Sequence, residues 1–433
     1  MMKTIKFKLY KQKKEFISGK TIIGIDPAKQ HHQAAVVNPF GVQLGKSFSF
    51  PVTSKGFNDT LWKKLNSLCP QYTPDNLLFA VETSCNLWKT IACYLHQKGY
   101  SLLLVNPLTT HHSRPLMNQD FSKTDPKDAF LVAKNAFDAH YKLYQSFTPQ
   151  NNRLHQLSIA YDKLLKDKIK NLLRIRSFME EVFPEFLNCI GIESKTALFL
   201  LESYFLPCHF LALDIDKTAP IVEQISRHQY DKQLLLKLKE SASKTIGVDR
   251  ASEEQSLRII LDSWLLELKQ IDNQIKIVMD EMITLAKQSN HFRILTSLKG
   301  ISDNLAAQFI AECRDLNNFK HYKQIEKLAG LNLCLCQSGD YIGQRHISHI
   351  GNRRLLRIIY QMTVQTATYI PEVRIKFLTR QLKKKAYRKN IIAASSALLQ
   401  LIMALIKKNK TYEFKEEKMQ QLALLEEKNQ KAA

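Results

Sequence analysis

The stretches Thr21-Ile-Ile-Gly-Ile-Asp26 and Leu77-Leu-Phe-Ala-Val-Glu82 decide how the N-terminal part of this chain folds. Each is a short apolar run that ends on an acid, as a buried strand does when its last side chain points out at the edge of a sheet. A third stretch, Lys123-Thr-Asp-Pro-Lys-Asp-Ala129, places two more acids three residues apart on the first turn of a helix, where they share one face. The sequence therefore predicts that four carboxylates converge: Asp26, Glu82, Asp125 and Asp128.

Four converging carboxylates supply the hard oxygen donors that Mg²⁺ (or Mn²⁺) prefers, and such ions catalyse phosphodiester chemistry. Taken singly, each acid has a plainer interpretation. Asp26 could form a turn before Pro27, Glu82 could end a loop, and Asp125 could cap its helix. The co-occurrence of two strands that end on acids with a Lys-Thr-Asp-x-x-Asp helix start favours the metal site.

The sequence around these acids predicts an α/β domain. Strands are expected at residues 21–26, 33–38, 77–82 and 101–105, and helices at 55–68 and 87–98. The first two strands are joined by a connection short enough for an antiparallel pair, and the later strands alternate with helices as crossover units do. An RNase H-like sheet has this mixture.

After Ala129 the sequence predicts helices. An uninterrupted heptad seam, typical of a coiled coil, contains Leu257, Leu261, Trp264, Leu268, Ile271, Ile275, Val278, Met282 and Leu285. A second long helix, at about 153–182, could pair with it within one chain or between chains. Residues 190–250 look helical and rich in loops but contain no motif.

Beyond His291, residues 295–310 read as helix, Gly300 turn and helix, with Ser302 or Asp303 available as the cap. Such a helix-hairpin-helix unit can hold a DNA phosphate on backbone N–H groups, although an ordinary corner between two helices fits this segment equally well. Pro371 is followed by a basic helical tail that includes an apolar helix at 391–406.

The net charge of +23, from 63 Lys and Arg against 40 Asp and Glu, indicates a polyanionic partner, with nucleic acid first among the candidates. Ribosome-associated and membrane-surface proteins are also basic, so this charge counts only together with the carboxylates. The 8 cysteines are scattered without Cys-x-x-Cys pairs, which argues against a zinc ribbon or a disulfide framework. No signal peptide or stretch of membrane-span length is expected, so we expect a cytoplasmic protein.

Ser338, before Gly339 and ahead of an arginine-rich stretch, is a candidate hydroxyl nucleophile. From these residues alone a turn serine followed by phosphate-binding arginines is the better interpretation. The basic residues that we expect to contact nucleic acid are Lys123, Lys299, Arg345, Arg353, Arg354, Arg357, Lys383, Lys384 and Lys385.

Several motifs in fixed order resemble those of the DEDD-type insertion-sequence transposases, the family numbered one hundred and ten, which includes the pilin-inverting recombinases. These motifs are Gly24-Ile-Asp-Pro-Ala-Lys29, Glu82-Thr, Lys123-Thr-Asp-Pro-Lys-Asp-Ala129, the heptad middle, Gly300-Ile, Ala329-Gly-Leu, Ser338-Gly, Ile347-Ser-His-Ile-Gly-Asn352 and Arg357. The resemblance spans roughly residues 20–365.

The resemblance implies an RNase H/RuvC-like domain with the tetrad Asp26, Glu82, Asp125 and Asp128, and a serine nucleophile at Ser338. It implies a bacterial, nucleoid-associated DNA recombinase that forms a covalent phosphoserine intermediate. A structured bridge RNA would guide it to target and donor DNA. It also implies a homo-oligomer, a dimer of dimers, in which the acidic site of one subunit meets the serine of another and the heptad seam joins subunits.

The expected organisation is a basic segment at 1–19, a RuvC-like domain at 20–148, a coiled-coil region at 149–290, a transposase domain at 291–370 and a basic tail at 371–433. Two alternative functions remain open. One is a metal-dependent junction endonuclease in which water attacks and Ser338 is structural. The other is a non-catalytic scaffold that binds nucleic acid.

Overall fold

The computed structural model describes residues 2–84, 86–116, 122–146, 148–334, 337–338, 341–343, 346–384 and 386–430. The side chains of residues 2–7, 337–338, 341–342, 428 and 430 lie outside this description. The chain divides into two compact units, Met1–Ser146 and Phe147–Ala433. The expected finer boundaries at 290 and 370 stay predictions.

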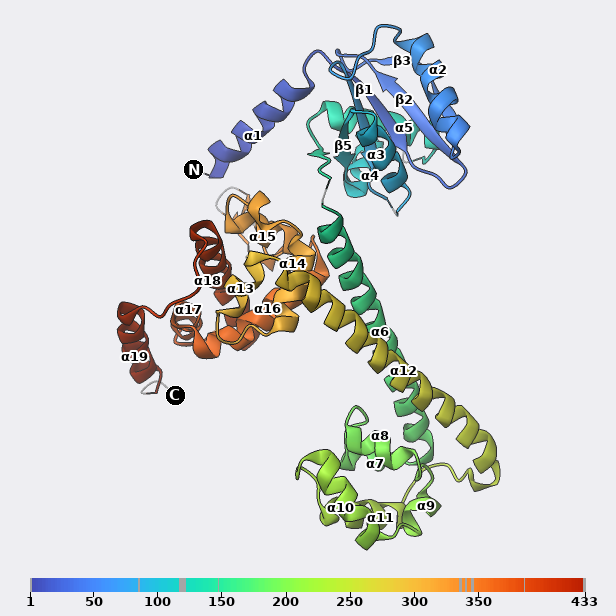
Figure 1. Ribbon diagram of the computed structural model, residues 1–433, viewed down its shortest axis with the longest axis vertical. Coiled ribbons are helices and arrows are strands. Elements are labelled where there is room, and N and C mark those ends of the chain that lie inside the picture. The colour runs from blue at the N-terminus through green and yellow to red at the C-terminus, as the bar shows by residue number, and fades with distance from the viewer. Residues whose placement is uncertain are drawn as a thin grey trace. The chain divides into compact units, whose positions relative to one another are not determined.

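Unit 1, Met1–Ser146, is built on a mixed six-stranded sheet in the order β3-β2-β1-β4-β5-β6 (Figure 1). Strands β1, β2 and β3 are antiparallel neighbours, β1, β4 and β5 are parallel, and β6 is antiparallel to β5. The strands are β1 Thr21–Asp26, β2 His31–Val37, β3 Gln43–Pro51, β4 Leu77–Glu82, β5 Ser101–Val105 and β6 Lys142–Leu143. The helices are α1 Met2–Ile17, α2 Leu61–Leu68, α3 Trp88–Gln97, α4 Pro107–Ser113 and α5 Asp125–Phe137, with short turns η1 Gly56–Thr60 and η2 Arg114–Leu116.

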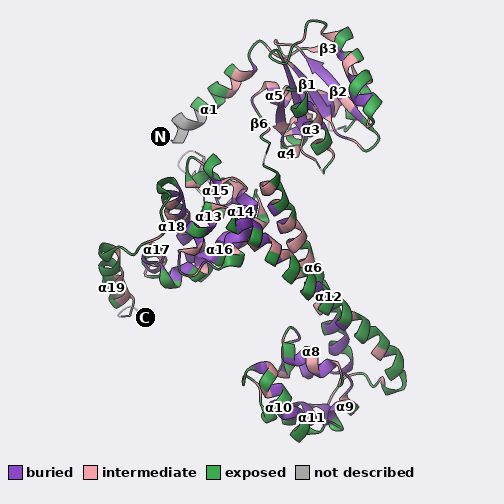
Figure 2. Ribbon diagram, viewed as in Figure 1, coloured by how far each residue is buried: buried purple, intermediate pink, exposed green. Residues whose placement is uncertain are grey.

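Helices cover both faces of this sheet. On one face, Val132, Ala133 and Ala136 of α5 share a buried cluster with alternate side chains of β1, β4 and β5. On the other face, α2 and α3 pack on the side chains that point the opposite way. The side chains on both faces of the central strands are therefore buried, and Figure 2 colours β1 mostly as buried.

Gly24, in the middle of β1, allows α5 to lie directly on the strand. A Cβ atom at this position would lie 2.5 Å from the backbone nitrogen of Ala133 and 2.8 Å from its Cβ, and closer still to the carbonyl oxygen of Ala129. Real Cβ atoms do not approach other atoms so closely, so only glycine fits here. This contact fixes the height of α5 above the sheet, and with it the first turn that contains Asp125 and Asp128.

The α/β prediction for this part is confirmed, including the antiparallel first pair. Strand β3 was not predicted from the sequence, which was expected to have no strand at residues 43–51. Its sequence Gln43-Leu-Gly-Lys-Ser-Phe-Ser-Phe-Pro51 is mostly polar or small before Phe48, and only Phe48 and Phe50 are buried. The basic N-terminal segment forms helix α1, for which no structure was predicted.

Unit 2 is mainly helical. Its helices are α6 Pro149–Val182, α7 Phe186–Cys189, α8 Lys195–Leu201, α9 Pro207–Leu211, α10 Ile215–Ser226, α11 Lys232–Ser243, α12 Glu254–Lys287, α13 Asn290–Thr296, α14 Asp303–Cys313, α15 Tyr322–Ala329, α16 Arg353–Tyr369, α17 Pro371–Gln381, α18 Tyr387–Lys408 and α19 Glu416–Gln430. Its short strands are β7 Leu333–Cys334, β8 Gln337–Ser338, β9 Tyr341–Ile342 and β10 His346–Ile347, and its turns are η3 Ala251–Glu253 and η4 Leu316–Asn318.

The two long helices α6 and α12 pack along each other within one chain (Figure 1). The predicted seam of α12 faces inward, with Leu261 and Met282 fully buried. The two ends of this pair join separate cores: one contains α7 to α11, and the other contains α13 to α18. The seam is therefore used inside the chain, and its predicted role in joining subunits stays a prediction.

The predicted helix, turn and helix around Gly300 is confirmed as α13 and α14, with Gly300 at φ +103° and Ser302 as the cap of α14. The expectation that no stretch reaches membrane-span length is wrong for α18, which is long and apolar enough by length and composition. Half of its apolar window is buried inside unit 2, where Leu398, Ile402 and Met403 belong to the core. This pattern is that of a core helix.

We predict that Gly24→Ala destabilises the protein by about 3 kcal/mol or more, because α5 must move off β1 to admit the new methyl group. Gly99→Ala is the matched control. Gly99 has φ +82° and open space around its Cβ position, so only backbone strain of about 1 kcal/mol is expected there. Urea unfolding followed by circular dichroism measures both, and equal losses would argue against the packing role of Gly24.

Candidate functional site

The four predicted acids lie on three elements of unit 1 that meet at one edge of the sheet. Asp26 ends β1 and Glu82 ends β4, and each directly follows the last pair of the parallel register, Ile25 with Val81. Asp125 and Asp128 begin α5, which packs on β1 through Gly24. Asp26 and Glu82 are half-buried, Asp125 is exposed and Asp128 is buried.

The acids influence one another electrostatically. The pKa of Asp26 is raised to about 7, first by burial and then by the negative charges of Glu82, Asp128 and Asp125, while Lys123 lowers it. Like charges disfavour the ionised form of a carboxyl group when they lie nearby. The three neighbouring acids therefore lie close enough to Asp26 to add to the effect of burial on its pKa.

Asp128 already has a cationic partner, Arg114 of η2. Arg114 Nε donates to Asp128 Oδ1 and Arg114 Nη2 donates to Asp128 Oδ2, both at 2.8 Å. The hydrogen bond to Asp128 raises the pKa of Arg114, and the charges of Glu82 and Asp26 act in the same direction. Arg114 therefore supplies positive charge at the edge where the four acids lie.

The donor set suits a hard divalent cation, because four carboxylates supply oxygen ligands and Arg114 and Lys123 compensate their charge only in part. Among the residues that the structure describes, however, no three carboxylate, imidazole or thiol side chains lie close enough together to hold a metal ion as they stand. Arg114 is one physical reason, since it occupies both oxygens of Asp128. The types of ligand present therefore suit a metal ion, and a metal site made of these acids would require their side chains to move.

The backbone of the second candidate, Ser338, lies in a short antiparallel ladder. Strand β8 pairs with β9, matching Ser338 with Tyr341, and β7 pairs with β10, matching Cys334 with His346. The side chain of Ser338 lies outside the described residues, as do Arg345 and Lys385. Their predicted roles stay predictions.

The chain between β10 and α16 contains the Ile347-Ser-His-Ile-Gly-Asn352 motif, and its close contacts explain two of these residues. A Cβ on Gly351 would lie 2.7 Å from the carbonyl oxygen of Leu328, so the chain entering α16 passes directly against the end of α15. Asn352 then caps α16, accepting from the N–H groups of Arg354 at 3.0 Å and Leu355 at 3.2 Å. Glycine and asparagine at these positions therefore anchor the chain where it enters α16.

Arg354 and Arg357, both predicted to bind nucleic acid, form ion pairs with acidic side chains of unit 2. Arg354 Nε donates to Glu312 Oε1 at 2.7 Å, and Arg357 pairs with Asp162 at 3.0 Å. Although burial raises the pKa of Glu312, hydrogen bonds from Arg354, Ser158 and Asn352 lower it below its usual range. These two arginines therefore stabilise the junction of α6, α14 and α16, and their contacts with nucleic acid stay predictions.

The other predicted contact residues in the described part of the chain are exposed: Lys123, Lys299, Arg353, Lys383 and Lys384. The Lys299 ammonium lies over the Tyr369 ring, 4.9 Å from its centroid. Because they are exposed, these side chains are accessible to the phosphates of a nucleic acid.

Sequence reasoning missed three residues of these sites. One feature of the sequence could have indicated Arg114: it is the only arginine among residues 1–146, where all the other Lys and Arg positions are lysine. Glu312 sits inside an apolar helix, where a lone acid suggests a buried partner. His32 is fully buried and accepts from the Ala28 N–H at 3.2 Å, which holds the backbone just after Asp26, and burial lowers its pKa to about 4.

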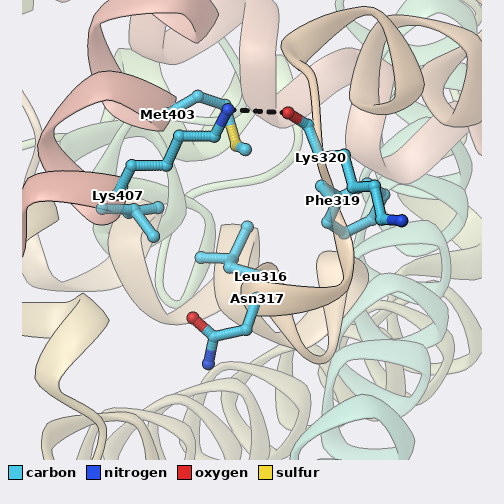
Figure 3. Close-up of a pocket in the computed structure, with 7 residues that line it drawn as sticks. Leu316, Asn317, Phe319, Lys320, Met403 and Lys407 are labelled. Atoms are coloured by element: carbon cyan, nitrogen blue, oxygen red, sulfur yellow. Dashed lines mark hydrogen bonds between the residues drawn. The ribbon is translucent and has the colours of Figure 1, made fainter.

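A pocket of about 370 Å³ lies elsewhere in unit 2, between η4 and α18 (Figure 3). The apolar side chains that line it are Leu316, Phe319, Met403 and Ile406. Lys407 Nζ donates to the Lys320 carbonyl oxygen at 2.7 Å. Its lining contains no acid or nucleophile. The acidic edge of unit 1 and the Ser338 segment therefore remain the candidate sites.

Two segments of the chain match family models of transposases. A family model described as transposase, of the DEDD type found in IS110 elements, matches residues 23–184, and a second, described as transposase of the IS116/IS110/IS902 family, matches residues 292–377. A protein of insertion element IS116 from Streptomyces clavuligerus is 23% identical over 81% of this chain and 85% of its own length. A protein of Streptomyces coelicolor named as a transposase for the mini-circle IS117 is 23% identical over 77% of this chain and 81% of its own length.

We predict that Arg354→Ala lowers the free energy of unfolding by about 3 kcal/mol, because it leaves the buried Glu312 charge without its guanidinium. The neighbouring Arg353→Ala removes the same charge from an exposed position and should change stability by less than about 0.5 kcal/mol. Chemical unfolding of the two variants compares them directly, and an equal effect would mean that the ion pair is not what stabilises this junction.

We predict that Asp26→Asn stabilises the metal-free protein in a pH-dependent way. Because the pKa of Asp26 is raised to about 7, its stabilising contribution is complete below about pH 4 and is lost as the pH rises through 7. The advantage of Asp26→Asn should therefore grow between pH 4 and 7 to at most about 4 kcal/mol.

Unfolding in EDTA at pH 4.5 and 8.5 tests this prediction. The exposed Asp75→Asn serves as the control and should show no such trend. A stabilisation by Asp26→Asn that is equal at both pH values would contradict the electrostatic cause.

Proposed function

Because the chain belongs to the IS110 family of insertion-sequence transposases, we propose that it cuts and rejoins DNA through a metal-dependent acidic tetrad and a covalent phosphoserine intermediate. It is a DNA transposase, and DNA is its substrate. The tetrad is Asp26, Glu82, Asp125 and Asp128, and the nucleophile is Ser338.

The observation that supports this proposal is geometric: Asp26 and Glu82 end the neighbouring parallel strands β1 and β4, and Asp125 and Asp128 begin α5, which packs on β1 at Gly24. The charges of Glu82, Asp128 and Asp125 also raise the pKa of Asp26, in addition to burial, which agrees with their lying near one another. The mixed strand order, with β1 between an antiparallel and a parallel neighbour, supports an RNase H/RuvC-like fold for this unit. Nuclease chemistry at the carboxyl edge of such a sheet is consistent with both features.

The four carboxylates would hold Mg²⁺ or Mn²⁺, which supplies charge stabilisation for the transferring phosphoryl group. Ser338 Oγ would attack the scissile phosphorus, so that an Oγ–P bond forms as the bond from phosphorus to one sugar oxygen breaks. The hydroxyl proton passes to a base, and the departing sugar oxygen takes up a proton. Because the phosphodiester energy is kept in the serine ester, rejoining needs no nucleotide cofactor.

We further propose that a structured bridge RNA selects the target and donor DNA, while the protein contacts the backbones of both nucleic acids. The net charge of +23 and the exposed Lys123, Lys299 and Arg353 support backbone contact. Base pairing would then supply the sequence choice, as in other RNA-guided systems. Assembly as a homo-oligomer, a dimer of dimers, belongs to the same proposal.

We predict that the purified protein, with Mg²⁺, RNA from the non-coding flank of its element and labelled DNA, gives a protein–DNA adduct on a denaturing gel. Ser338→Ala should abolish the adduct because the ester oxygen is gone, and Asp125→Asn should abolish it because a metal ligand is gone. The control Ser263→Ala removes an exposed hydroxyl that bonds only within its own helix in the described structure, and should leave the adduct unchanged.

Nicked DNA without an adduct, retained in Ser338→Ala, would instead indicate an endonuclease in which water attacks. An adduct that persists in Ser338→Ala would assign the nucleophile elsewhere. Loss of the adduct when the RNA is omitted would support guidance by RNA, and an RNA-independent adduct would argue against it.

A further inference from the structure

Arg114 forms hydrogen bonds with both carboxylate oxygens of Asp128, which are the atoms that a metal ion would need. Two guanidinium nitrogens, Nε and Nη2, each donate to a different oxygen of the same carboxylate at 2.8 Å. Such a side-on pair covers the lone pairs of both oxygens on the side that faces the arginine. The Arg114 and Asp128 side chains are only 15% and 4% exposed, so water screens the pair weakly.

The neighbouring contacts hold Arg114 in this position. Ser113 Oγ, at the end of α4, donates to Asn135 Oδ1 of α5 at 2.7 Å, seven residues beyond Asp128. The end of α4 is therefore attached to α5 at two points. Arg114 is also the only arginine among residues 1–146, where every other cationic side chain except histidine is lysine. A lysine could not form the two-pronged contact.

We propose that Arg114 is a positioning residue that occupies Asp128 until a divalent cation replaces it, so that the guanidinium and the metal ion compete for one carboxylate. This inference rests on the proposed function, because it takes the four acids to be a metal site. It accounts for the finding that no three acids of the described residues stand ready to hold an ion. The metal-free protein thereby keeps a buried carboxylate paired.

Competition lowers the apparent affinity for the metal, because part of the binding energy is used to displace Arg114. Removing the guanidinium should therefore tighten metal binding while weakening the metal-free fold. A purely structural Arg114, which merely orients Asp128 toward the ion, predicts the opposite change in affinity. The two roles can thus be separated without any measurement of catalysis.

The test is calorimetric titration of the full-length, EDTA-stripped protein with Mn²⁺, in the absence of nucleic acid. Arg114→Gln should bind Mn²⁺ roughly tenfold more tightly than the wild type, because one nearby positive charge is lost. Arg114→Lys, which keeps the charge without the fork, should fall between the two. Lys134→Gln is the matched control on the same helix α5, and its affinity should equal that of the wild type.

Thermal unfolding provides the second measurement. In EDTA, Arg114→Gln should melt below the wild type, and Mn²⁺ should raise its melting temperature more than it raises that of the wild type. If Arg114→Gln does not fold in EDTA, recovery of its fold on adding Mn²⁺ is the expected result, and Arg114→Lys then provides the comparison of affinities. Unchanged or weaker binding in both variants overturns the proposal.

Asp125→Asn separates failure of this inference from failure of the proposed function, because it leaves the Arg114 contact with Asp128 intact. If the wild type binds Mn²⁺ and Asp125→Asn weakens that binding, the metal site stands, and only the behaviour of the Arg114 variants decides the competition. If Asp125→Asn does not alter Mn²⁺ binding, the acidic edge is not the metal site, and both proposals fail.

Discussion

The close packing of α5 on β1, which Gly24 permits, is the contact on which the acidic edge depends. The sheet register alone brings Asp26 and Glu82 together, because they end neighbouring parallel strands. The other two acids come from a helix that follows much later in the chain, and they reach the same edge only because that helix lies directly on the strand backbone. A single missing side chain in β1 therefore determines whether two carboxylates or four share one electrostatic environment.

Bringing four carboxylates together costs stability, and the charges around them show how the fold accommodates this cost. The pKa of Asp26 is raised to about 7, so near neutral pH the site holds fewer charges than it has carboxyl groups. Arg114 neutralises the most buried acid, Asp128, and Lys123 acts on Asp26 from the helix start. With such partial compensation, the proposed metal site would be stable without an ion and would still attract one.

The sequence could predict the features of this fold that depend on local patterns. Apolar runs ending on acids located β1 and β4, and heptad spacing located α12, because hydrophobic periodicity is a local property. Strand β3 could not be found in this way, since its first half is mostly polar or small and it is a strand because of its pairing with β2. The partners of Arg114 and Arg354 lie 14 and 42 residues away, so their roles emerge only when the chain is folded.

Each unit contains an arginine that contacts both oxygens of a buried acid, Arg114 with Asp128 and Arg354 with Glu312. The surroundings of the two pairs differ, and the difference suits Arg354 to a fixed structural contact and Arg114 to the proposed replacement by a metal ion. Glu312 accepts from Arg354, Ser158 and Asn352, which come from α16, α6 and the residue capping α16, and its side chain is fully buried. Removing any one partner leaves an unsatisfied buried acceptor, so this cluster fixes the start of α16 against α6 and α14. The described hydrogen bonds to the Asp128 side chain come from Arg114, at an edge where three other acids lie nearby. A divalent cation arriving there would meet several carboxylates at once, and its larger charge can repay the loss of one guanidinium contact.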